Sequence, residues 1–295
     1  TIPVVVSNRC KDAKVSQFTE EFVMGLRINT NVAALNTTRI LRINTRDLNR
    51  SLERLSSGLR INRAADDAAG LAIAEGFRSV VRGSRVAQRN AQDGISLVQT
   101  TEGALTESIH VLQRIRELAV QAANGTNSTQ NRESLDLEVQ QLLEQLDDIA
   151  MDTEFNGLWV LSANQTVTIQ AGPQPSQTMI ITVQGAKTDD LGISTVSISG
   201  VGLAVSAIST VDLALKSVAV LRSSLGALQN RLEFTINTLA IQEENSASSE
   251  SQIRDADIAM ETMRFTRNQV LVSAGTSVLA QANIVPQTAL QLLGG

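Results

Sequence analysis

A stripe of leucines in the N-terminal third of the sequence most constrains the fold. Its members step by seven, four, three and four residues, so they follow one side of a helix as a narrow apolar seam. A helix cannot bury such a seam by itself, so the pattern predicts a partner helix. The helix weakens at Ser56-Ser57-Gly58, and Asp66-Asp67 suits the start of the next one, where the helix dipole favours carboxylates. The stripe consists of Leu41, Leu48, Leu52, Leu55 and Leu59.

The amino-acid composition argues against a compact globule. Six Phe, one Trp and no Tyr are few for 295 residues, whereas slender helical packing uses Ala, Leu, Ile and Val. The net charge of −5 comes from scattered residues, so no nucleic-acid partner is predicted. No apolar run approaches the ~20 residues of a membrane-spanning helix, so no membrane insertion is predicted either.

Three further apolar stripes have helical spacing, and one region has the period of a β-hairpin. Alternation at 166–170 and 179–183, around a Gly-Pro turn, predicts a hairpin, and 193–198 is a further candidate strand. A Ser-rich stretch at 246–251 is expected to be a soft joint before a last helix from about Ile253 to Leu292. The helical stripes are Leu105, Ile109, Leu112, Ile115 and Leu118; Leu135, Val139, Leu142, Leu146 and Ile149; and Val218, Leu221, Leu225, Leu228, Leu232 and Leu239.

These elements predict a mainly α fold, a long antiparallel, coiled-coil-like helical bundle with a small β-hairpin region and paired termini. The apolar seams near the two ends of the chain are buried most simply when the chain doubles back and the two terminal helices pack against each other. We expect a terminal-helix domain with its linker from residues 24–64 and 251–295. Residues 65–250 form a rod, with the hairpin region at about 155–200. Terminal helices with few neighbours would bury their faces against other copies, and a head-to-tail contact that does not close gives an open filament.

The first 23 residues differ from the rest of the sequence. They contain Pro3, the apolar run Val4 to Val6 and the single cysteine, Cys10, without a helical period. The coherent pattern begins at Met24. We therefore expect Met24 to be the initiator and residues 1–23 to be a non-native upstream extension or a disordered segment.

Several long motifs match one known family. They are MGLRINTNVAALN from Met24, LSSGLRINRAADDAAGLAIA, NAQDGISLVQTTEGAL, LQRIRELAVQAANGT, EFNG, LRSSLGALQNRLE, IRDADIAMET and AGTSVLAQANIVPQ. In these motifs the chain resembles bacterial flagellin, the subunit of the flagellar filament, from Met24 to about Leu161 and from about Ala207 to Leu293. The short middle section corresponds to a form without outer variable domains.

The resemblance implies a structural role in motility, in which subunits self-assemble into a hollow filament that turns motor torque into thrust. It also implies an extracellular location, reached by export through the flagellar type III apparatus. Implied partners are other flagellin subunits, an export chaperone, and hook-associated and cap proteins. Assembly and chaperone contacts are expected at Leu41, Leu48, Leu52, Leu271, Val278, Leu279, Ile284 and Leu290.

A recognition surface is a further implication of the resemblance. Flagellins bound by Toll-like receptor 5 use an arginine, a leucine and a glutamate in motifs that match Arg114, Leu118 and Glu138 here. Arg114 and Leu118 are four residues apart, which places them on one side of a helix, and Glu138 is expected on the facing helix. The same residues also suit packing between subunits.

Catalytic chemistry has few candidates in this sequence, and no cofactor is expected. His110 is the only histidine, so histidine-rich metal sites and a histidine-based serine triad are not available, and His110 is expected on a helix surface. The adjacent pairs Asp66-Asp67 and Asp147-Asp148 cannot converge on a helix, and solvated or dipole-stabilised charges are expected. We therefore predict that the chain is not an enzyme. A hook-filament junction protein and a secreted enzyme on a coiled-coil frame are the alternatives.

Overall fold

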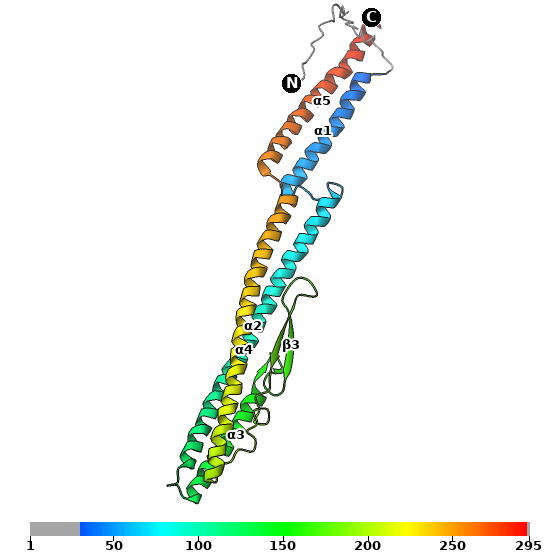
Figure 1. Ribbon diagram of the computed structural model, residues 1–295. Helices are drawn as coiled ribbons and strands as arrows, with labels where there is room; N and C mark the ends of the chain where they lie inside the picture. The colour runs from blue at the N-terminus through cyan, green and yellow to red at the C-terminus, as the bar shows by residue number, and fades with distance from the viewer. Residues whose placement is uncertain (1–29, 294–295) are drawn as a thin grey trace, which may run out of the picture. The chain divides into compact units, whose positions relative to one another are not determined.

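The computed structural model describes residues 30–293, with the side chains of 289, 290, 292 and 293 left out (Figure 1). The expectations for residues 1–23 and Met24 lie outside the described residues. The described chain divides into two compact units. We call residues 30–58 and 256–293 the terminal unit, and residues 59–255 the central unit. These boundaries lie a few residues from those expected at 64 and 251.

The terminal unit is a pair of antiparallel helices, α1 (Val32–Ser57) and α5 (Ile258–Leu293) (Figure 1). The side-chain amide of Asn31 donates a 2.8 Å hydrogen bond to the backbone carbonyl of Ala282 at one end of the pair. At the other end Arg54 lies 3.8 Å from Glu261. The start of the described chain therefore lies beside the far part of α5, as the seam pattern predicted.

Helix α1 ends at Gly58, whose φ of +71° is the left-handed cap that a glycine adopts at low cost. The amide of Gly58 donates to the carbonyl of Arg54, and its own carbonyl accepts from the amide of Ala256. The break expected at Ser56-Ser57-Gly58 is therefore confirmed. The next helix, α2, begins after Asp67, whose carboxylate accepts a 2.8 Å hydrogen bond from the amide of Gly70.

The central unit is built on two long antiparallel helices, α2 (Ala68–Ala123) and α4 (Val201–Arg254). Ion pairs follow their length, and the partner on α4 moves toward the C-terminus as the residue on α2 moves toward the N-terminus. The pairs are Arg116–Asp212 at 2.6 Å, Glu102–Arg222 at 3.0 Å, Arg85–Glu243 at 2.6 Å and Glu75–Arg254 at 2.9 Å.

Helix α3 (Thr129–Asp152) returns along α2, and the three predicted stripes meet in one hydrophobic core. Leu105, Leu112 and Leu146 are fully buried. Leu225 and Leu232 of α4 belong to the same core. The periodicity alone therefore identified the buried sides of all three helices.

Two small hairpins follow α3. Strands β1 (Glu154–Phe155) and β2 (Leu158–Trp159) pair across an Asn-Gly turn, and β3 (Gln165–Gln170) pairs with β4 (Thr178–Val183) in antiparallel register. The β3–β4 hairpin is the one that the period-two pattern predicted. It lies against α2, where Gly94 leaves room for the side chain of Ile169.

Residues 193–198 do not form the further strand that their sequence predicted. The backbone amide of Ile198 donates to the carboxylate of Asp136 at 2.6 Å, and the carbonyl of Val196 accepts from Gln140. Just before this segment, the amide and hydroxyl of Thr188 both donate to Asp147 at 2.8 Å. Side chains of α3 thus take the place of a neighbouring strand, and Asp147 is a structural acceptor rather than a solvated charge.

The soft joint expected at 246–251 is also absent, because α4 continues through it to Arg254. Ser246 is buried, and the hydroxyl of Ser249 donates to the carbonyl of Asn245 within the helix. Arg254 is held by Glu75 of α2. Packing against α2 therefore keeps a serine-rich stretch helical, and the helix ends only at Asp255.

Helix α4 corrects one expectation from the sequence, because one stretch of it is apolar and long enough to cross a membrane by length and composition alone. Of that stretch, 28% is buried inside the unit. Core helices of other proteins meet the same two criteria, and Val211, Val218 and Leu225 belong to the hydrophobic core here.

Candidate functional site

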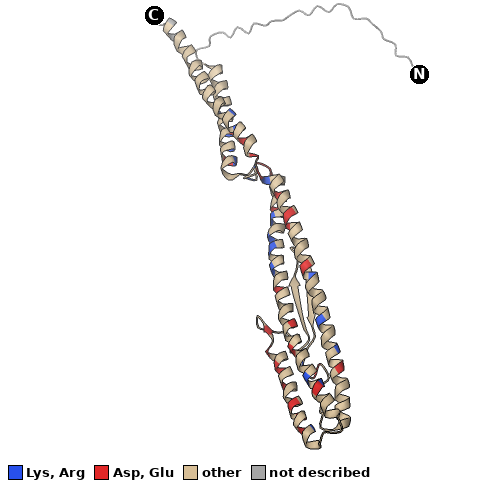
Figure 2. Ribbon diagram, turned by 90° about the vertical axis from the view of Figure 1, so that its left-hand side faces the viewer, with Lys and Arg blue, Asp and Glu red and all other residues tan. Residues whose placement is uncertain are grey.

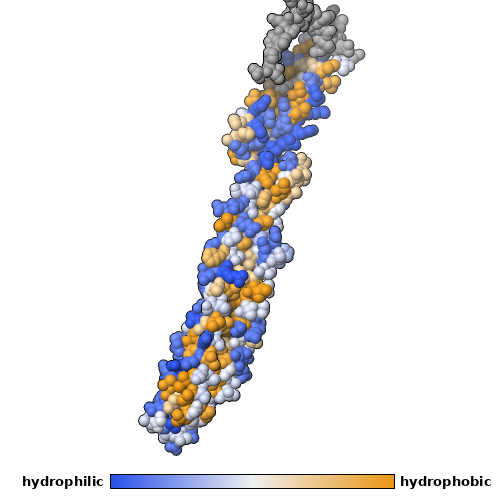
Figure 3. All heavy atoms as spheres, in the orientation of Figure 1, coloured by the Kyte–Doolittle hydropathy of each residue, from blue (hydrophilic) through white to orange (hydrophobic). Residues whose placement is uncertain are grey.

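The terminal unit has almost no hydrophobic core of its own. Among its described side chains, Ser51 and Glu261 are the buried ones, and both are polar. A pair of helices can cover only the stripe at which the two helices touch, so the remaining apolar side chains face outward. Figure 3 shows hydrophobic residues on the surface of this unit, between hydrophilic ones. The unit therefore presents an apolar surface that the single chain leaves uncovered.

Some of the residues predicted for assembly lie between α1 and α5, and the others are exposed on the outside of the helix pair. Leu41, Leu48 and Leu279 are partly buried, and Leu41 lies against Gly275 of the opposite helix. The exposed ones are Leu52, Leu271, Val278 and Ile284, with exposed fractions of 55%, 40%, 56% and 53%. The side chain of Leu290 lies outside the described residues.

Sequence reasoning missed several of the most exposed apolar side chains of the terminal unit. Leu35, Met263 and Val270 are 65%, 64% and 62% exposed. They lie away from the seam that pairs α1 with α5, so a single apolar stripe does not include them. In the sequence they are recognisable as apolar residues on a second side of the same helix.

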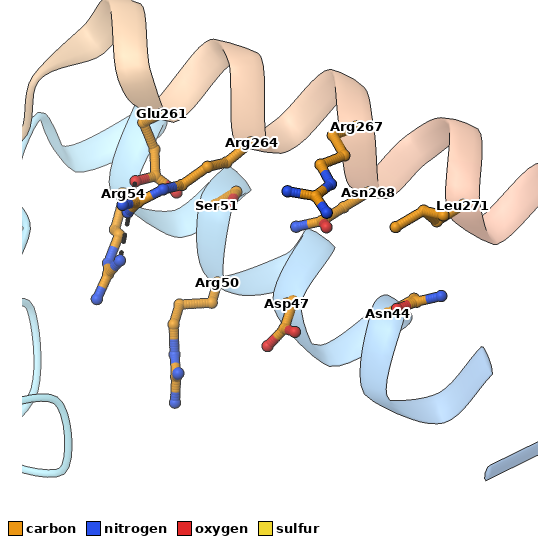
Figure 4. A pocket seen from close by; sticks show the side chains of 10 residues that line it. All are labelled: Asn44, Asp47, Arg50, Ser51, Arg54, Glu261, Arg264, Arg267, Asn268 and Leu271. Carbon is orange, nitrogen blue, oxygen red and sulfur yellow. Dashed lines mark hydrogen bonds and ion pairs between the residues drawn. The ribbon is translucent and has the colours of Figure 1, made fainter. Parts of the chain in front are cut away.

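A polar groove of about 400 Å³ runs between α1 and α5 (Figure 4). Arg54 and Arg264 reach toward the buried carboxylate of Glu261, at 3.8 Å and 3.4 Å. The remaining lining residues are Asn44, Asp47, Arg50, Ser51, Arg267, Asn268 and Leu271. Four arginines against two carboxylates make the groove basic.

The predicted recognition residues lie in the central unit, and the structure brings two of them together. The guanidinium of Arg114 on α2 donates to Oε1 of Glu138 on α3 from Nη2 at 2.8 Å and from Nε at 3.1 Å. This hydrogen bond, followed by one to Glu117, raises the pKa of Arg114 above its ordinary value. Arg114 and Glu138 are about half exposed.

Leu118, the third residue predicted for recognition, is not accessible at the surface beside Arg114. Its exposed fraction is 1%, and it belongs to the hydrophobic core of the central unit. Two positions four residues apart on a helix differ by about 40° in direction, which at the edge of a packed face separates solvent from core. Leu118 therefore supports the surface near Arg114 from below.

His110, the single histidine of the sequence, is exposed on α2 as expected. Within the described part of the chain, no group of three or more His, Cys, Asp and Glu residues is placed to hold a metal ion. The features that the two units present are an uncovered apolar surface and charged surfaces, which are means of binding other proteins.

Comparison with known proteins agrees with this arrangement. Residues 28–166 match the bacterial flagellin N-terminal helical region, and residues 208–293 match the bacterial flagellin C-terminal helical region. The chain is 43% identical to a flagellin of Bacillus subtilis, over 91% of this chain and 100% of that one. It is 48% identical to a flagellin of Halalkalibacterium halodurans, over 90% of this chain and 99% of that one.

A solved structure described as a flagellar hook-associated protein of Vibrio parahaemolyticus has a TM-score of 0.54 to this chain. The two are 11% identical, and the match covers 64% of this chain and 100% of that one, so it shows a shared fold alone. The flagellin matches do not favour the hook-filament junction alternative, since they span both helical regions and nearly the full length of the relatives. This chain belongs to the bacterial flagellin family.

Proposed function

We propose that the α1–α5 pair is the surface through which this chain, a structural subunit of the bacterial flagellar filament, joins other copies. The observation that carries this proposal is the terminal unit's lack of buried apolar residues among its described side chains, beside many exposed ones. Burying apolar area gains about 25 cal/mol per Å², so covering these side chains with those of other copies stabilises a polymer. Contacts that repeat without closing produce an open helical filament.

A point variant on α5 tests this proposal. Val270→Asp adds a charge at a side chain that is 62% exposed, so the folded monomer tolerates it but a dry contact between copies does not. We expect seeded filament growth, followed by electron microscopy, to stop in this variant. Gln269→Asp is the matched control, because it adds the same charge at the adjacent exposed position without removing an apolar side chain. Normal growth of Val270→Asp would contradict the proposal.

Export and partner binding are further parts of the proposal. The subunit leaves the cell through the flagellar type III apparatus, and an export chaperone covers the apolar side of α5 before assembly. Hook-associated and cap proteins bind the two ends of the filament. The exposure of Val278 and Ile284 in the single chain supports a need for such cover.

Calorimetry tests the chaperone contact. We expect the export chaperone of the source cell to bind the wild-type monomer, and Val278→Asp to weaken that binding by at least tenfold, since a carboxylate is costly to bury. Thr276→Asp, at an exposed polar position on the same helix, is the control. Equal affinity of both variants would exclude this part of α5 as the binding surface.

Recognition by Toll-like receptor 5 is proposed for the surface at Arg114 and Glu138. Both side chains are accessible on neighbouring helices and present one charge of each sign. In a receptor reporter-cell assay we expect Arg114→Ala monomers to signal more weakly than the parent. Arg116→Ala is the control, since Arg116 is similarly exposed but pairs with Asp212. Equal signalling by the parent and the Arg114 variant would count against the proposal.

A further inference from the structure

The terminal and central units carry opposite charges. The described part of the terminal unit has seven arginines and four carboxylates, whereas the central unit has 14 basic and 23 acidic residues. Figure 2 shows how these charges are distributed over the helices. Because each copy of the chain carries both units, every basic surface in a polymer has an acidic surface available on another copy.

The basic charge of the terminal unit gathers in the groove of Figure 4. Glu261 is buried there between Arg54 and Arg264, so its charge is already matched inside the groove. Arg50 and Arg267 also line the groove, and both side chains are exposed. With four arginines and two carboxylates in its lining, the groove carries a net positive charge and suits an incoming carboxylate.

The strongest acidic excess of any described helix is on α3, which has seven carboxylates and one arginine. That arginine, Arg132, is buried and donates to the backbone carbonyls of Ala122 and Asn124, so it does not offset the surface charge. Three of the seven carboxylates are engaged within the unit: Asp136 with the amide of Ile198, Glu138 with Arg114, and Asp147 with Thr188.

The other four carboxylates of α3, Glu133, Glu144, Asp148 and Asp152, are exposed. Glu144, Asp148 and Asp152 are spaced by four residues, so they lie along one side of α3 at steps of about 6 Å. Arg50 on α1 and Arg267 on α5 line the groove with exposed side chains, so two consecutive carboxylates of α3 can face two arginines there.

We infer that the arginine groove between α1 and α5 binds the acidic side of α3 of a second copy, centred on Glu144 and Asp148. This inference rests on the polymerisation proposed above and names a pair of surfaces that meet in it. The contact is heterologous, because it joins two different surfaces, so it repeats from copy to copy without closing.

Charge reversal and rescue test this contact in the full-length chain. The groove variant carries Arg50→Glu and Arg267→Glu, and the α3 variant carries Glu144→Arg and Asp148→Arg. Each variant is polymerised alone and followed by light scattering and electron microscopy. We expect each to polymerise about tenfold more slowly than the wild type, since like charges then oppose each other. The combined variant restores opposite charges and is expected to recover to within about threefold of the wild-type rate.

A mismatched variant controls for net charge. It combines the groove substitutions with Asp93→Arg and Glu107→Arg, two exposed carboxylates of α2, and has the same net charge as the combined variant. If it recovers as well as the combined variant, the inference is overturned. The inference is equally overturned if the groove variant polymerises at the wild-type rate. Loss in the groove variant with none in the α3 variant would assign the groove to another anion and would also overturn it.

A second measurement separates this inference from the proposal of filament assembly. The groove variant and the α3 variant are mixed without filament seeds, and sedimentation velocity is used to look for soluble mixed oligomers. In the mixture the groove of each variant meets an α3 of opposite charge on the other variant, so the two variants can alternate. We expect dimers and larger oligomers in the mixture and only monomers in each variant alone. If the wild type forms no filaments, the assembly proposal fails, and the oligomer measurement still decides the contact. A mixture that contains only monomers overturns the inference.

Discussion

Arg114 on α2 donates two hydrogen bonds to a single carboxylate oxygen of Glu138 on α3, at 2.8 Å and 3.1 Å. Both side chains are about half exposed, so water and salt screen the pair. We expect Glu138→Gln to leave the thermal unfolding midpoint almost unchanged, at low and at high salt. A clear loss of stability that appears only at low salt would contradict this, and would show that the pair holds α3 onto α2.

Leu118 is expected to behave in the opposite way. It is 1% exposed, so Leu118→Ala leaves a cavity and should lower the free energy of unfolding by about 2 to 5 kcal/mol. Urea unfolding followed by circular dichroism measures this change. Leu137→Ala on α3 is the control, since Leu137 is 69% exposed and should change stability by less than about 0.5 kcal/mol. A weaker reporter-cell signal from Leu118→Ala therefore needs this stability measurement beside it.

Gly58 is required by the backbone conformation at the end of α1. Its φ is +71°, and no atom lies within 4 Å of the place where a Cβ would stand, so the cost of Gly58→Ala is conformational. We expect faster hydrogen exchange in the last turn of α1, corresponding to about 1 to 2 kcal/mol. Gly103→Ala, in the open interior of α2, should instead stabilise its helix by about 0.4 to 1 kcal/mol. Equal effects of the two substitutions would refute this account.

Asp147 and Asp148 are neighbours in sequence with different roles. The carboxylate of Asp147 accepts two hydrogen bonds from the buried Thr188, so Asp147→Ala leaves a buried amide unsatisfied. We expect a loss of about 1 to 3 kcal/mol in the free energy of unfolding, measured with urea. Asp148→Ala should change it by less than about 0.5 kcal/mol, because Asp148 is exposed. A larger effect at Asp148 would contradict the assignment.

Local pattern was enough to predict the helices and the hairpin. Apolar residues three and four apart, as at Leu112 and Leu146, identified the buried sides of α2, α3 and α4. Strict alternation identified β3 and β4, and Gly58 marked the end of α1. These features depend on neighbours along the chain, so the order of residues is sufficient to find them.

Local sequence patterns gave wrong predictions where contacts with residues far along the chain decide the structure. Alternation at 193–198 indicated a strand, yet Asp136 holds the backbone of Ile198 in an irregular loop. The serines at 246–251 indicated a joint, yet packing against α2 keeps them helical. In the candidate site the sequence predicted only some of the exposed apolar residues. The prediction used a single apolar stripe, and Val270 lies outside that stripe.

The sequence by itself determined that this chain forms long amphipathic helices with a short hairpin, and its long motifs showed the resemblance to flagellin. Only the tertiary structure decided which apolar residues are covered and which remain for other copies. Leu41 and Leu52 belong to one apolar seam on α1, yet Leu41 lies against Gly275 whereas Leu52 is 55% exposed. Leu118 of α2 is buried in the core of the central unit. Periodicity states the direction of a side chain on its own helix, but burial depends on which distant helix lies opposite, and that is a property of the packed chain.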